Sequence, residues 1–138
     1  MGKIEDLLGL EFKLETKDET YYSIYIFLTI DNKTSKDRSI DVSKATYVTS
    51  KREQLEQDFW VNGYMQGEGN IKPNSFIKAG LAFEMTKLKN VLEKDNVYIP
   101  IKLVKEGVEL NLRFQKTRNT WILEEIEKVD IEIELTPK

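Results

Sequence analysis

Residues 21–34 decide the fold of this chain and read Tyr-Tyr-Ser-Ile-Tyr-Ile-Phe-Leu-Thr-Ile-Asp-Asn-Lys-Thr. Apolar side chains occupy alternate positions, which share one face of a pleated strand. These positions are Tyr22, Ile24, Ile26, Leu28 and Ile30. The other face is mixed rather than fully polar and holds Tyr21, Ser23, Tyr25, Phe27 and Thr29. Because β-branched and aromatic residues suit a half-buried pleated surface, we predict a central strand. Asp31 to Ser35 would end it in a turn.

The length and charge of the chain fit one folded domain, residues 1–138. A domain of this size buries roughly 68% of the surface that its unfolded chain exposes. The net charge of −3 gives no overall basic field, so we expect neither a nucleic-acid partner nor an anionic membrane. No apolar run reaches the roughly 20 residues of a membrane helix, and the N-terminus lacks the apolar region of a signal peptide. An export signal upstream of Met1 would make the domain extracytoplasmic, whereas a native start at Met1 would make it cytoplasmic.

The chain contains no cysteine and no histidine. These absences exclude a thiol nucleophile, a disulfide framework, an imidazole base and nearly every zinc or copper site built from protein ligands. We therefore expect a protein that is not an enzyme and that holds no cofactor and no metal.

Further strands are predicted wherever apolar residues alternate. The segments are 8–14, 40–42, 45–49, 77–85, 97–104, 108–114, 121–126 and 129–135. Between Val42 and Ala45 the alternation shifts by one residue, which indicates a bulge or break near Ser43-Lys44. Pro100 lacks a backbone N–H, which predicts that its strand lies at an edge or at a bulge.

Two connecting segments are less regular. Ser50 to Glu53 fits the capping box of a short helix or the polar turn of a hairpin, and the surrounding strand pattern favours the hairpin. Phe59 to Asn70 contains three glycines and no sustained period, which predicts a loop carrying aromatic side chains. Lys72 to Ser75, with Pro73 at its second position, predicts a β-turn.

About eight short strands separated by turn signals, with no long helix, predict an all-β antiparallel fold, either a sandwich or a barrel. A sandwich is favoured because many strands have one apolar and one polar face.

Three segments carry a resemblance to a known set of domains. They are Ile-Asp-Asn-Lys-Thr at 30–34, Tyr-Val-Thr-Ser at 47–50, and Ile-Lys-Pro-Asn-Ser-Phe-Ile-Lys-Ala-Gly-Leu-Ala-Phe-Glu-Met at 71–85. Together they resemble the immunoglobulin-like sandwiches, called telokin-like or immunoprotective-extracellular, of bacterial lipoproteins and envelope proteins. The resemblance covers residues 8–103 and implies an immunoglobulin-like β-sandwich with a binding or accessory role, and it brings no catalytic residue. The missing export signal and the acidic end, 119–138, depart from the pattern.

Phe59, Trp60 and Tyr64 are the candidate binding residues. Aromatic rings offer a large contact area at a low entropic cost, so these three could form a recognition surface. The alternative, which the sequence favours, is that the rings fold back and cover one end of the core.

Acidic side chains concentrate near the C-terminus, at Glu124, Glu125, Glu127, Asp130, Glu132 and Glu134. They could form a weak calcium site or, as a pair, a glycosidase site. Ligands in one row along a strand rarely converge, however, and nothing indicates a cleft. We expect a solvated face or a charged edge that prevents aggregation between sheets.

A hairpin with basic and aromatic residues spans Arg113, Phe114, Lys116, Arg118 and Trp121. Basic grooves with stacking rings bind single-stranded nucleic acid. Phe114 shares the parity of Leu110 and Leu112, however, so we expect it in the core. The net negative charge of the chain also disfavours a nucleic-acid partner.

We expect a non-catalytic binding or interaction module that contacts a protein or an envelope component. The contact would involve the Phe59–Asn70 segment or an open sheet edge. The alternative is a structural accessory domain or an assembly subunit, of a phage or in the cytoplasm, without a small-molecule ligand. The sequence predicts no membrane insertion and leaves the oligomeric state open.

Overall fold

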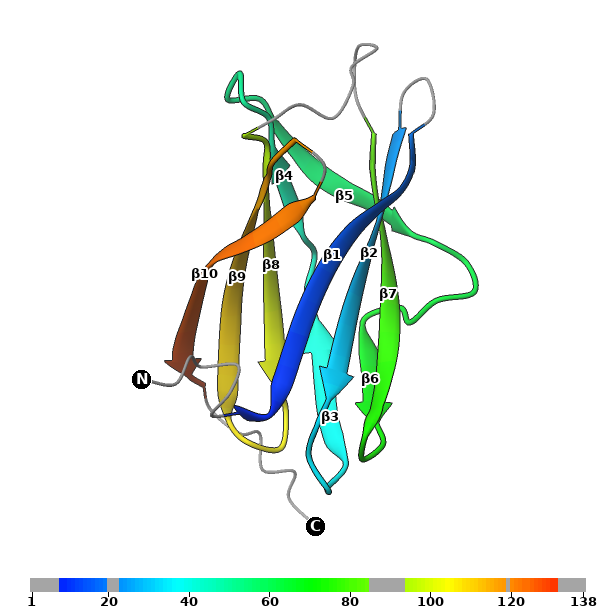
Figure 1. The fold of residues 1–138 in the computed structure, drawn as a ribbon, viewed down its shortest axis with the longest axis vertical. Coiled ribbons are helices and arrows are strands. Elements are labelled where there is room, and N and C mark those ends of the chain that lie inside the picture. The colour runs from blue at the N-terminus through cyan, green and yellow to red at the C-terminus, as the bar shows by residue number, and fades with distance from the viewer. Residues whose placement is uncertain (1–7, 20–22, 85–93, 119, 132–138) are drawn as a thin grey trace.

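The structure is a computed structural model and describes residues 8–19, 23–84, 94–118 and 120–131. These residues form ten β-strands and no long helix (Figure 1). The strands are β1 (Leu10–Glu19), β2 (Ser23–Asn32), β3 (Arg38–Val42), β4 (Thr46–Val48), β5 (Gln54–Trp60), β6 (Glu68–Ile71), β7 (Ser75–Glu84), β8 (Asn96–Leu103), β9 (Val108–Lys116) and β10 (Trp121–Asp130). The predicted all-β class is confirmed, with more strands than the eight expected.

The strands form one continuous sheet that curves into a nearly closed, barrel-like shape (Figure 1). Antiparallel pairing runs from β1 through β2, β7, β5, β4, β8 and β9 to β10, while β3 pairs with β8 and β6. β5 makes the sheet continuous, because Gln54 to Glu56 pair with β4 and Gln57 to Trp60 pair with β7. Where the ends of the sheet approach each other, Trp121 Nε1 on β10 donates a hydrogen bond to Thr16 Oγ1 on β1 (3.0 Å).

The central strand predicted from the sequence is β2, which lies between β1 and β7 (Figure 1). Its burial alternates along its whole length, with Ile24, Ile26, Leu28 and Ile30 at most 1% exposed. Tyr22 lies outside the described residues. The period-2 pattern therefore placed the core face of this strand correctly.

The predicted break at Ser43-Lys44 is present between β3 and β4, and Pro100 lies opposite it. Val42 pairs with Ile101, whereas Thr46 pairs with Tyr98, so β3 and β4 together contain one residue more than β8 between these pairs. This extra residue shifts the buried parity from Ile40 and Val42 to Ala45 and Tyr47.

The position of Pro100 decides between the two predicted alternatives, an edge strand and a bulge. Its strand is internal to the sheet and not at an edge, because β8 pairs with β9 on one side and with β3 and β4 on the other. The carbonyl of Pro100 accepts a hydrogen bond from Ser43 N (3.0 Å) on the broken side. Because the N–H and C=O of one strand residue point to the same side, the missing donor also faces the break, where no ladder bond is lost.

The segment Phe59 to Asn70 is less loop-like than predicted. Phe59 and Trp60 belong to β5, Glu68 to Asn70 belong to β6, and only residues 61–67 connect the two strands. β5 has a register shift at Asp58 and β6 contains Gly69, so neither strand shows the uninterrupted alternation on which the prediction relied. The hairpin favoured for Ser50 to Glu53 is confirmed, since it joins β4 to β5.

The end of the described chain forms one strand where the sequence predicted two. β10 covers the first predicted segment, 121–126, and continues without a break to Asp130, the second residue of the other predicted segment. It has a register shift between Leu123 and Glu125. Ile133 and Leu135, part of the second predicted strand, lie outside the described residues. Residues 104–107 form the turn between β8 and β9, with Gly107 at a φ of 69°.

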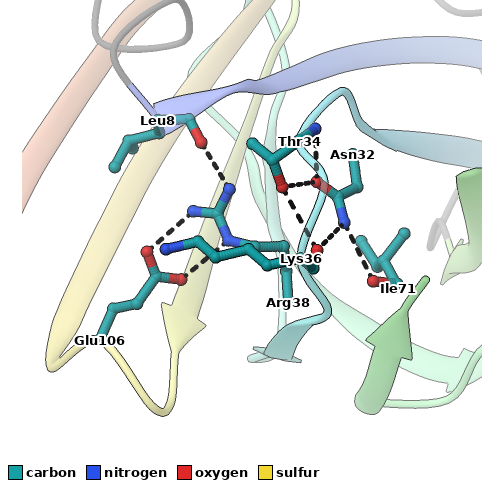
Figure 2. A network of polar contacts seen from close by, with 7 residues as sticks. All are labelled: Leu8, Asn32, Thr34, Lys36, Arg38, Ile71 and Glu106. Carbon is teal, nitrogen blue, oxygen red and sulfur yellow. Dashed lines mark hydrogen bonds and ion pairs between the residues drawn. The ribbon is translucent and has the colours of Figure 1, made fainter. Parts of the chain in front are cut away.

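Buried polar side chains fasten the loop after β2 (Figure 2). The Asn32 amide is fully buried, donates to the carbonyls of Lys36 (2.8 Å) and Ile71 (3.0 Å), and accepts from Thr34 N (3.0 Å) and Thr34 Oγ1 (2.6 Å). The Asn-x-Thr turn noted in the sequence is therefore a structural element, because its asparagine satisfies backbone groups of two separate segments.

Candidate functional site

The structure separates the three aromatic residues singled out from the sequence. Because the register shifts at Asp58, Trp60 turns inward and packs against the core, while Phe59 turns outward and is 45% exposed. Tyr64, in the connection after β5, lies over the outer face of β2, where its ring centroid is 4.3 Å from that of Phe27. Trp60 thus has the core-covering role, and Phe59 and Tyr64 belong to a surface.

That surface is the outer face of β2, β5 and β7, the side away from the core. Among the described residues it carries five aromatic side chains, which we call the outer aromatic stripe. Its members are Tyr25, Phe27, Phe59, Tyr64 and Phe76. Tyr25 and Phe27 are half-buried, whereas Phe76 is 60% exposed and stands at the opposite end of the stripe from Phe59.

Small residues at the centre of β7 make room for the rings. Gly80 is the cross-strand neighbour of Phe27, and Ala82 is the neighbour of both Tyr25 and Phe59. Gly80 and Ala82 are both buried although they lie on the outer face, so the aromatic side chains form a cover over them. The rings of Tyr25 and Phe59 meet edge to face at 6.2 Å, a favourable arrangement for aromatic pairs.

The connection between β5 and β6 is held against β7 by backbone hydrogen bonds. Val61 N donates to Gly80 O (3.1 Å), and Met65 N donates to Lys78 O (3.0 Å). A Cβ on Gly80 would lie 2.7 Å from the Cβ of Val61 and 3.4 Å from the Tyr64 ring. Glycine at position 80 therefore permits the close approach that sets Tyr64 beside Phe27.

Two lysines flank the rings. Lys17 Nζ lies 5.4 Å from the centroid of Phe27 and 5.8 Å from that of Tyr64, and Lys78 Nζ lies 5.7 Å from that of Phe27. These distances fall within the range of cation–π attraction, which at exposed sites contributes about 0.5–1 kcal/mol. The surface therefore combines apolar area with two positive charges.

Sequence reasoning selected Phe59 and Tyr64 but not the other members of this surface. Tyr25 and Phe27 belong to the outer face of the central strand, which the sequence showed to be mixed rather than polar. These exposed-side aromatic residues were the one indication of the surface in the sequence. The lysines and Phe76 gave none, because their proximity to the rings depends on which strands pair.

The acidic and basic residues near the C-terminus are placed differently. Glu124, Glu125, Glu127 and Asp130 are all exposed on β10, which pairs with β9 alone. Within the described part of the chain, no three acidic side chains are grouped closely enough to hold a metal ion. Glu132 and Glu134 lie outside that part.

The predicted basic and aromatic hairpin contributes its rings to the core. Phe114 is 1% and Trp121 is 7% exposed, so neither offers a stacking face. Arg113 Nη2 donates to Glu125 Oε1 (3.1 Å) and Nη1 donates to Asn96 Oδ1 (2.9 Å). The hydrogen bond with Glu125 raises the pKa of Arg113. These two residues also line a hollow of about 320 Å³ beside Tyr98 and Pro100.

Comparison with known proteins gives a likeness of fold. No protein-family model and no curated protein sequence matches the chain. A FixG-related protein from Vibrio parahaemolyticus superposes with a TM-score of 0.51 and 8% identity, over 79% of this chain and 95% of that one. At this identity the likeness shows the fold alone.

Two further solved structures are similar at a lower level. The ASH/PapD-like domain 7 of human CEP192 has a TM-score of 0.43 and 12% identity, over 82% of this chain and 87% of that one. The structural genomics target SoR45 has a TM-score of 0.40 and 12% identity, over 94% of this chain and 90% of that one. In addition, the described residues contain no helix long and apolar enough to cross a membrane.

Proposed function

We propose that the domain is a non-catalytic interaction module whose outer aromatic stripe contacts a partner protein. The observation that carries the proposal is the exposure of Phe59 (45%) and Phe76 (60%) on one outer face of the sheet, where Phe59 adjoins Tyr25 and Lys78 separates Phe76 from the other rings. Scattered exposed apolar residues are ordinary, whereas a contiguous patch marks an interaction site. Aromatic anchors also dominate the energetics of protein interfaces.

We also infer that the barrel-like sheet is an immunoglobulin-like sandwich closed along one side by β5. In that fold, strands A, B, E and D form one sheet and strands C, F and G form the other. The observed order β1-β2-β7-β5 fits the first sheet, and β3 with β4, β8 and β9 fits the second. β6 and β10 are additions. Together with the Asn32-Lys33-Thr34 turn, this order supports kinship with the telokin-like or immunoprotective-extracellular domains.

Selection from a phage-displayed library of random peptides tests the interaction function. We expect the wild-type domain to enrich a consistent group of peptides, and the double variant Phe59→Ser, Phe76→Ser to lose them. Tyr98→Ser is the matched control, because Tyr98 is 41% exposed but lies on β8, outside the stripe. Enrichment that persists in the double variant, or is lost equally in the control, would contradict the assignment of this surface.

A further inference from the structure

We propose that the occupant of the outer aromatic stripe is an extended protein segment in which a carboxylate stands between two apolar side chains. This inference rests on the proposed function and specifies the chemistry of the partner. It follows from the spacing and charge of the residues on the outer face of β7.

The stripe has a regular order along β7. Going toward the N-terminus of the strand, Ala82 and Gly80 lie under the aromatic rings, Lys78 follows, and Phe76 comes last. Side chains on one face of a strand recur at about 7 Å, so the distance from Gly80, under the rings of Phe27 and Tyr64, to Phe76 is about 14 Å. An extended segment presents its own side chains at the same interval. In a segment with the pattern apolar–x–acidic–x–apolar, the first apolar side chain would contact the rings, the acidic side chain would contact Lys78, and the second apolar side chain would contact Phe76.

The charges support an acidic residue at the middle position. Two nearby lysines form ion pairs with carboxylates of the domain itself. Lys13 pairs with Glu15 (3.7 Å), and Lys33 pairs with Glu11. Among the described residues, no ion pair involves Lys17 or Lys78. Both ammonium groups are therefore available to a carboxylate that lies beside Phe27.

Acidic residues of the domain mark the limits of this positive region. Asp31 is the cross-strand neighbour of Phe76, and Glu84 ends β7 beyond Ala82. Lys17 and Lys78 lie beside Phe27, and the carboxylate of Glu15, the β1 neighbour of Phe27, is paired with Lys13 (3.7 Å). The two lysines would therefore fix the register of a bound segment.

The ring orientations favour a peptide over a flat polysaccharide. The planes of Phe27 and Tyr64 are inclined by 44°, and those of Tyr25 and Phe59 by 65°. A sugar chain that stacks on several rings needs them nearly coplanar. Inclined rings instead present faces in different directions, against which separate side chains can pack.

Titration with three capped synthetic peptides tests the proposal, with amide chemical shifts of the labelled domain as the readout. The peptides are Phe-Ser-Glu-Ser-Phe and its versions with Gln or Lys in the middle. We expect the Glu peptide to shift amides of β2 and β7 and to bind about two- to fivefold more tightly than the Gln peptide, with the Lys peptide weakest. The preference should decrease as salt is raised.

Variants of the domain locate the effect. Lys17→Gln with Lys78→Gln should remove the preference for Glu over Gln. The control Lys105→Gln with Lys128→Gln changes the net charge equally, on residues outside the stripe, and should keep the preference. Loss of the preference in both double variants would show a general charge effect and overturn the proposal.

The remaining outcomes separate this inference from the proposed function. Equal binding of the Glu and Gln peptides would overturn the inference that the partner is acidic, but it would retain the proposal that the stripe is an interaction surface. Failure of all three peptides, with stripe-dependent enrichment from the random library, overturns the inference and retains the function. A concentration-dependent dimer in sedimentation velocity, dispersed by Phe59→Ser with Phe76→Ser, would make a second copy of the chain the occupant and overturn the inference.

Discussion

The guanidinium of Arg38 holds the carboxylate of Glu106 through two hydrogen bonds of 3.0 and 2.9 Å, although the residues are 68 positions apart in the chain. Arg38 is 2% exposed, and its third contact, Nη1 to the carbonyl of Leu8, is 2.5 Å long (Figure 2). The side chain of Arg38, on β3, therefore connects the β8–β9 turn to the backbone of Leu8, just before β1. A buried guanidinium requires such partners, because an unpaired buried charge is strongly destabilising.

Glu106→Gln should lower the free energy of unfolding by about 3 kcal/mol, since it leaves the buried Arg38 without a counter-charge. Urea denaturation measures this change. Glu11→Gln is the control, because it removes one member of the exposed pair with Lys33 and should cost less than about 1 kcal/mol. Equal effects of the two substitutions would contradict a special role for the Arg38–Glu106 pair.

Asn32→Asp should also be strongly destabilising, by about 3 kcal/mol. The substitution replaces the amide donor with an oxygen that faces the carbonyls of Lys36 and Ile71 in a fully buried site. Thermal unfolding and urea denaturation provide the measurement. Asn70→Asp makes the same chemical change at an exposed position on β6 and should stay within about 0.5 kcal/mol of the wild type. A mild effect at position 32 would mean that the loop after β2 rearranges freely.

Gly80→Ala should displace the connection between β5 and β6, because the new Cβ would lie 2.7 Å from the Cβ of Val61. We expect a loss of about 1–3 kcal/mol in stability. Amide shift changes should centre on residues 61–65, and peptide binding by the stripe should weaken. Adding Val61→Gly removes the opposing atom and should recover part of the loss, which a double-mutant cycle quantifies. Strictly additive effects would show that the two positions do not meet.

The two tryptophans should differ in their accessibility to acrylamide. Trp121 is 7% exposed, whereas Trp60 is only partly buried against the core. In Trp121→Phe, the fluorescence of Trp60 should be quenched more strongly than that of Trp121 in Trp60→Phe. Circular dichroism of both variants controls for intact folding. Equal, weak quenching would place Trp60 fully in the core, and strongly red-shifted emission would place it on the surface.

The sequence was most informative where one strand had one buried face. Ile24, Ile26, Leu28 and Ile30 alternate without interruption, because the face of β2 toward the core excludes polar side chains. The break after Val42 could also be predicted from the sequence. A single extra residue moves the apolar side chains from even to odd positions, because it exchanges the two faces of a strand.

Prediction failed where the register was interrupted or the pairing partner mattered. The shift at Asp58 concealed that Phe59 and Trp60 belong to β5. The charged residues Glu127 and Lys128 interrupted the apolar pattern within β10 and divided it in the prediction. For Pro100 the prediction of an edge or a bulge was correct but open, because only the neighbouring strands distinguish the two. The strand is internal, and the chain opposite Pro100 is broken by one extra residue.

The sequence by itself determined the all-β class, the buried faces of the main strands and the chemistry that the chain lacks, because each depends on residue type and local period. Tertiary structure alone decided how the candidate surface is assembled. Phe27, Tyr64, Lys17 and Lys78 come from separate segments, and their meeting depends on the pairing of β1, β2 and β7 and on the missing side chain of Gly80. Such long-range pairing is set by the packing of the whole sheet, which no local stretch of sequence encodes.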